Sequence, residues 1–151
     1  MRTCVEETGV SYTQQLQILE CADYNIGSLD GIEQFQQLRV LNLRLNDIQD
    51  LSPLADLKNL SYLDISRNQV SDISPLTKLV QLNTLAAANN SITNIEALGT
   101  LPKLDRLYIN DNRIASLEPV KDIASIRHLT ANNNPAGFPS ALPANIATYR
   151  I

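Results

Sequence analysis

Few residues in this 151-residue chain could carry out chemistry. His128 is its only histidine, and Cys4 and Cys21 are its only cysteines. A serine or cysteine nucleophile needs a base within hydrogen-bonding distance, so any such arrangement would depend entirely on His128. Asp105 and Asp111 are near His128 in the sequence, but no spacing places a nucleophile beside them. We therefore expect no catalytic residue and no enzymatic activity.

Metal and cofactor sites also lack their donors. One histidine and two cysteines are too few for a structural zinc site, which takes four ligands. The segment LNDIQD at 45–50 spaces its carboxylates too widely for a calcium loop. The five glycines are isolated rather than grouped into a phosphate-binding loop. The sequence thus predicts no metal ion and no cofactor.

Charge and hydropathy exclude two classes of partner. The formal net charge is −4, so the chain lacks the excess of Lys and Arg that neutralises nucleic-acid phosphates. No apolar run approaches the roughly 20 residues that cross a bilayer, and no apolar stretch follows Arg2 as it would in a secretory signal. Either the protein is cytosolic or its export signal lies outside these residues.

An internal repeat predicts the secondary-structure elements that would position these residues. The chain holds 23 Leu and 15 Asn, and the leucines recur with a period of 22 residues. Each repeat follows the frame LxxLxLxxNxIxxLxxLxxLxx, with seven apolar positions. A regular period of this length is the signature of a stacked repeat fold. The repeats begin at Leu16, Leu38, Leu60, Leu82, Leu104 and Ile126.

The spacing within the frame predicts the local structure. The LxxLxL part places leucines at alternating positions, as in a strand with one buried face. Such a strand cannot bury its face alone, so successive copies must stack as a parallel sheet. Pro53, Pro75 and Pro119 interrupt the return segment, whose apolar residues recur every three positions. That spacing favours extended chain or short 3₁₀ turns over a full helix.

One asparagine follows each strand except the first, where Tyr24 stands instead. The chain must turn sharply at this position and leave backbone groups pointing inward. An amide side chain offers both a donor and an acceptor to such groups, so we expect a ladder of stacked asparagines. Its members are Asn46, Asn68, Asn90, Asn112 and Asn134.

The frame resembles that of leucine-rich repeat proteins. The 22-residue period, together with Asp-Leu-Ser-Pro-Leu at 50–54 and Asp-Ile-Ser-Pro-Leu at 72–76, resembles the bacterial internalin-type and phosphatase-regulator-type subclass. The resemblance covers residues 16 to about 145. It implies an α/β solenoid, a right-handed superhelix with a concave parallel β-sheet and convex 3₁₀ or irregular segments.

The domain organisation follows from the same frame. We expect one domain, with an N-terminal cap at 1–15, five 22-residue repeats at 16–125, and an atypical repeat and cap at 126–151. A cap would cover the open edge of the first strand. Ile146, Tyr149 and Ile151 match strand positions after a shortened repeat of 20, so a seventh, partial strand is expected.

Two interpretations of the cysteines remain open. Cys21 occupies an inward strand position, where a small buried thiol would fit. Cys4 lies in the expected cap, and a bond between the two would close a 16-residue loop. The segment around them also resembles the N-terminal cap of some exported bacterial leucine-rich repeat proteins, in which such a pair is disulfide-bonded.

Function must lie on the strand positions that face away from the core. In the fourth repeat these positions hold small residues, which predicts a shallow notch between Tyr62 and Tyr108. Nearby arginines could bind carboxylates. Asn132 and Asn133, next to the ladder residue Asn134, are expected to be solvated. The candidate partner-binding residues are Arg44, Tyr62, Asp64, Arg67, Thr84, Ala86, Ala88, Arg106, Tyr108 and His128.

The sequence therefore favours a non-catalytic, monomeric module that binds another protein on its concave face. The resemblance implies an exported, internalin-like bacterial protein that is secreted, periplasmic or displayed on the cell surface. Two alternatives stay open: a cytoplasmic regulatory or scaffold subunit of an enzyme such as a phosphatase, and a purely structural spacer.

Overall fold

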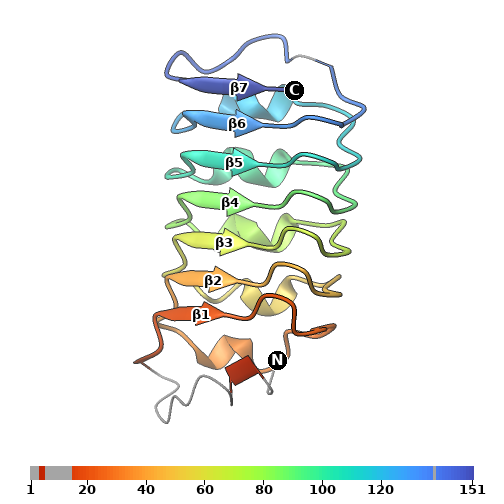
Figure 1. Ribbon diagram of the computed structural model, residues 1–151. Coiled ribbons are helices and arrows are strands. Elements are labelled where there is room, and N and C mark those ends of the chain that lie inside the picture. Colours follow the sequence, from red (N-terminus) through yellow and green to blue (C-terminus); the bar gives the residue numbers. More distant parts are fainter. Residues whose placement is uncertain (1–3, 6–14, 138) are drawn as a thin grey trace.

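The fold is a single open sheet backed by short 3₁₀ helices, as the sequence predicts (Figure 1). The computed structural model describes residues 4–5, 15–137 and 139–151. All seven strands of the sheet are parallel and stack in chain order. They are β1 (Ile18–Glu20), β2 (Val40–Asn42), β3 (Tyr62–Asp64), β4 (Thr84–Ala86), β5 (Arg106–Tyr108), β6 (His128–Thr130) and β7 (Thr148–Arg150).

The repeat period sets the register of the sheet. Leu41 pairs with Leu63, and each further step as far as β6 advances by 22 residues. The last step is shorter, because Leu129 pairs with Tyr149. This confirms the seventh strand expected after a 20-residue spacing. The central leucine of each strand from β1 to β6 is fully buried, so the core lies against one face of the sheet.

The return segments contain short 3₁₀ helices, which lie behind the strands in Figure 1. In the second repeat the Leu54 N–H donates to the Leu51 carbonyl, and Leu57 and Leu60 continue this i to i−3 pattern at 3.0 Å. Apolar spacing of three residues thus matches the three-residue turn. The helices are η2 (Ile32–Gln34), η3 (Ser52–Leu54), η4 (Ser74–Lys78), η5 (Glu96–Thr100) and η6 (Glu118–Asp122).

The asparagine side chains link each repeat to the one before it. The Asn112 Oδ1 accepts the Ile92 N–H at 3.0 Å, and its Nδ2 donates to the carbonyls of Ala87 and Ile109 at 2.9 and 3.1 Å. Asn112 is only 7% exposed, so water cannot readily replace these bonds. The same pattern recurs at Asn46, Asn68, Asn90 and Asn134.

A disulfide joins Cys4 to Cys21, with their Cα atoms 5.7 Å apart. Both residues are buried in the core cluster beside Leu19. The sequence left open whether Cys21 is a free buried thiol or is bonded to Cys4, and the structure contains the disulfide. Most of the expected cap at 1–15 lies outside the described residues, and the domain boundaries stay a prediction.

The C-terminal segment is fastened to the preceding repeat by a side chain. The Glu118 carboxylate accepts the Ser140 N–H at 2.5 Å and the Ser140 hydroxyl at 2.6 Å. These bonds, helped by Lys121 at 3.8 Å, lower the pKa of Glu118. The loop that leads to β7 is therefore held against η6.

Replacing Asn112 by Ala should destabilise the protein strongly. The change leaves a buried N–H and buried carbonyls without partners, at about 1–3 kcal/mol for each unsatisfied group. We expect a loss of at least about 2 kcal/mol in denaturant unfolding. Asn59→Ala is the matched control, because Asn59 is exposed and donates only to the Gln36 carbonyl. Equal losses in both variants would contradict the ladder's role.

The disulfide is tested by alkylation and intact mass. Oxidised protein unfolded in denaturant without reductant should take up no alkylating agent, and reduced, unfolded protein should take up two. Cys4→Ser with Cys21→Ser should lose about 3 kcal/mol of stability, because the cross-link closes a loop of 16 residues. Two alkylated thiols in the oxidised, folded protein would rule out the bond.

Candidate functional site on the open face of the sheet

The face of the sheet that points away from the 3₁₀ helices, here called the open face, carries two columns of side chains. Strand alternation sends the central leucines inward and the flanking residues outward. The register places Tyr62, Thr84 and Arg106 side by side in the first column. The full columns are Ile18, Val40, Tyr62, Thr84, Arg106, His128 and Glu20, Asn42, Asp64, Ala86, Tyr108, Thr130.

The small residues and the tyrosines come together as the sequence predicts. Thr84 is 8% exposed and Ala86 is half-buried on β4. Half-buried Tyr62 and Tyr108 stand on the two neighbouring strands, β3 and β5. Because adjacent strands lie about 4.8 Å apart, the backbones of β3 and β5 are about 10 Å apart on either side of β4. Ala88 holds the next outward position after β4 and is half-buried.

Burial and nearby charge raise the pKa of the Tyr62 hydroxyl above its usual value. Desolvation is the main cause that raises its pKa, and Asp64, Glu20 and Tyr108 add to the effect. Tyr62 therefore presents a neutral hydroxyl to a ligand at physiological pH.

Some of the predicted polar residues also serve the local backbone. The Asp64 Oδ1 accepts the Ser66 N–H at 2.8 Å, and the Asn42 Oδ1 accepts the Arg44 N–H at 3.1 Å. Asn42 also donates to the Glu20 carboxylate at 2.7 Å. These side chains shape the turn after the strand, which the frame alone did not indicate.

One asparagine near the last repeats is less solvated than expected. Asn132 is half-buried, and both its backbone N–H and its Nδ2 donate to the Asn110 Oδ1, at 2.9 and 3.0 Å. Asn133 is exposed, but its amide donates to the Asp111 carboxylate at 2.7 Å. Asn133 is thus exposed as expected, whereas the expectation for Asn132 was wrong, because side chains at equal positions in adjacent repeats are close enough to bond.

The predicted arginines differ in how free they are. Arg106 lies 3.8 Å from the Asp105 carboxylate, which Arg127 approaches at 3.6 Å from the next repeat. Asp105 is largely buried, and the strand register places Arg106 next to His128 in the first column. Arg44 and Arg67 are exposed and form no ion pair with any residue that the structure describes.

The turn after each strand has an unusual backbone. The residue directly before each ladder position adopts a positive φ of 54–65°, and in the first repeat Asn25 also has a positive φ, of 53°. The residues before the ladder positions are Asp23, Leu45, Arg67, Asn89, Asp111 and Asn133. Their side chains form the rim of the open face, so the candidate residue Arg67 lies on this rim beside the column of Arg44 and Ala88.

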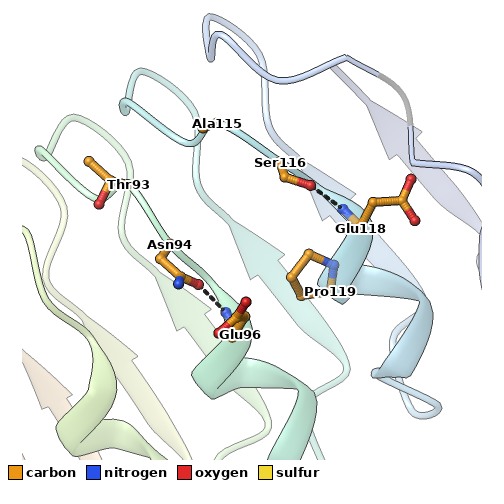
Figure 2. Close-up of a pocket in the computed structure, with 7 residues that line it drawn as sticks. All are labelled: Thr93, Asn94, Glu96, Ala115, Ser116, Glu118 and Pro119. Carbon is orange, nitrogen blue, oxygen red and sulfur yellow. Dashed lines mark hydrogen bonds between the residues drawn. The ribbon is translucent and has the colours of Figure 1, made fainter.

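A groove of about 250 Å³ lies on the helical side, between the segments leading into η5 and η6 (Figure 2). Its polar side chains are engaged in turns: the Asn94 Oδ1 accepts the Glu96 N–H, and the Ser116 Oγ accepts the Glu118 N–H. A similar groove recurs one repeat earlier, beside η4. It is therefore a gap between stacked repeats rather than a built ligand site. Sequence analysis did not anticipate it.

Across 4–5, 15–137 and 139–151, no group of three or more His, Cys, Asp or Glu side chains could hold a metal ion. Within those same ranges, no helix is both long and apolar enough to span a bilayer.

Comparison with solved structures gives internalins as relatives. The chain is 37% identical to internalin C2 of Listeria monocytogenes, with a TM-score of 0.73 over 75% of this chain and 50% of that one. A second internalin of the same organism is 25% identical, with a TM-score of 0.71 over 90% of this chain and 48% of that one. The chain spans about half the length of each.

A leucine-rich repeat protein of Leptospira interrogans shares the fold at 22% identity, with a TM-score of 0.63 over 82% of this chain and 39% of that one. Among curated proteins, no sequence matches the chain significantly. The family model for leucine-rich repeats in two copies matches residues 36–78 and 80–122, which is more than half of the chain. With its register and asparagine ladder, the chain belongs to the leucine-rich repeat family.

Proposed function

We propose that this chain is a monomeric, non-catalytic module that binds a partner protein on its open face, with the notch between Tyr62 and Tyr108 as the centre of contact. Leucine-rich repeat proteins generally mediate protein–protein interaction. The observation that carries the proposal is the pair of half-buried tyrosines around the small side chains of β4. Tyrosine is enriched at binding hot spots, where it fills or borders a desolvated pocket.

The rigidity of the face supports this role. Each strand is fixed by its neighbours and each turn by an asparagine, so little conformational entropy is lost when a partner binds. The outward groups are varied: a neutral phenol at Tyr62, a carboxylate at Asp64 and a cation at Arg106. Such a mixture gives specificity through complementary charge as well as contact area.

We also propose that the protein is exported and works outside the cytosol. The Cys4–Cys21 disulfide supports this, because such bonds persist in oxidising compartments. The similarity to internalins agrees with it. The scaffold and spacer alternatives remain outcomes of the experiments below.

Removing either tyrosine should weaken partner binding. A partner is first captured on the immobilised protein from extracts of the native source, and its Kd is then measured for Tyr62→Ala and Tyr108→Ala. Each variant should raise the Kd at least tenfold, about 1.4 kcal/mol, as expected for a hot spot. Val80→Ala is the control, because Val80 is 43% exposed and lies outside both columns of the open face. A captured partner with unchanged Kd for both tyrosine variants would remove the notch, and the absence of any partner would favour a spacer.

Filling the notch gives a complementary test. Ala86→Leu adds bulk at an outward position between the tyrosines, so it should exclude the partner without disturbing the core. We expect a Kd at least tenfold higher, with a thermal midpoint within about 3 °C of the wild type, which corresponds to about 1 kcal/mol. Normal affinity in a folded Ala86→Leu variant would show that no partner group enters the notch.

A further inference from the structure

Two residues on the rim adopt a backbone conformation that does not suit them. Six rim residues have φ between 54 and 65°, and four of them are Asp or Asn. Short polar side chains tolerate the left-handed region best among non-glycine residues. The other two, Leu45 and Arg67, have φ of 58 and 57° and gain no such local compensation.

The turn itself does not explain these two residues. The Leu45 N–H donates to the Ser66 carbonyl at 3.0 Å, and the Arg67 N–H donates to the Ala88 carbonyl at 2.8 Å. Equivalent bonds form at Asp23, Asn89 and Asp111. Because the backbone geometry is the same with Asp or Asn, nothing in the turn requires a leucine or an arginine. Strained backbone of this kind is most often retained where the side chain has a function.

The side chains of Arg44, Leu45 and Arg67 are exposed to solvent. Leu45 is 38% exposed, and Arg44 and Arg67 are exposed without an ion-pair partner among the described residues. Of the nearby carboxylates, Asp64 accepts the Ser66 N–H and Asp47 accepts the Gln69 amide, while Asp23 is exposed at the rim position next to Leu45. We call Arg44, Leu45 and Arg67 the rim patch.

The rim patch is compact. Leu45 and Arg67 hold the same position in adjacent repeats, whose strands lie about 4.8 Å apart. Arg44 directly precedes Leu45. The patch thus groups an exposed apolar side chain with two arginines, and each guanidinium can bind a carboxylate through two parallel hydrogen bonds.

We propose that the rim patch binds an acidic segment of the partner protein, which places an apolar side chain on Leu45 and carboxylates on Arg44 and Arg67. This deepens the proposed function and rests on it. The chemistry favours a protein segment over nucleic acid, because the chain carries a net charge of −4 and the patch includes an apolar centre.

The first test uses stability. Leu45→Asn and Arg67→Asn should each raise the thermal midpoint by about 2–4 °C, because asparagine suits the left-handed turn. Arg113→Asn is the matched control: it removes the same charge from an exposed arginine with negative φ and should leave the midpoint unchanged. A lower midpoint in Leu45→Asn or Arg67→Asn would mean that the residue stabilises the fold, and it would overturn the proposal.

The second test uses binding. A random dodecapeptide library displayed on phage is selected on the immobilised, disulfide-intact protein, and the bound peptides are resynthesised for affinity measurements. We expect peptides with an apolar residue flanked by Asp or Glu, and we expect the Leu45→Asn/Arg67→Asn double variant to bind them at least tenfold more weakly. Arg113→Asn should bind them normally.

The outcomes separate this proposal from the proposed function. Peptides without an acidic excess, peptides bound equally well by the double variant, or no enrichment above background would overturn the rim patch. Peptides that lose affinity to Tyr62→Ala and Tyr108→Ala but not to the double variant would support the notch and reject the rim patch. Peptides that respond only to the double variant would support the rim patch and count against the notch.

Discussion

The asparagine amide is the interaction on which the whole structure depends. The strands are only three residues long, so the sheet cannot hold a sharp turn at the end of each strand by its own hydrogen bonds. The buried Asn112 supplies the missing partners by joining the carbonyls of Ala87 and Ile109 and the N–H of Ile92. No apolar side chain could do this, and a hydroxyl has too few donors. The leucines stabilise the core, whereas the asparagine amides bond the backbone groups at the turn that follows each strand.

This division explains how much of the fold the sequence predicts. Burial on one side of a strand requires a strict two-residue alternation, and a three-residue turn requires apolar residues three apart, so both leave a pattern. The strands, the 3₁₀ helices and the 20-residue step to β7 were therefore predictable. The positive φ at Leu45 and Arg67 was not, because neither residue type indicates it. The bonds of Asn132 to Asn110 were also missed, since they depend on contact between repeats.

The candidate site is less predictable for a physical reason. The outward positions of each strand need only be compatible with solvent, so no period constrains them. Alternation alone identifies which residues face outward, and it correctly brought Tyr62 and Tyr108 to either side of β4. What those residues bind depends on the surface of another molecule. The features that still indicate a binding site are residues unlike those at the same position in other repeats, such as the small residues on β4 and the arginine in a left-handed turn.

The order of the strands has a consequence for how the molecule opens. Each strand is hydrogen-bonded only to its sequence neighbours, so the strands can separate one after another from either end of the sheet. The two ends are not equivalent. At β1 the Cys4–Cys21 cross-link ties the strand to the preceding segment, whereas at β7 the inward residues Ile146, Tyr149 and Ile151 are only half-buried. Amide protons should therefore exchange fastest around β7 and progressively more slowly toward the middle repeats, so that fraying proceeds in one direction along the solenoid.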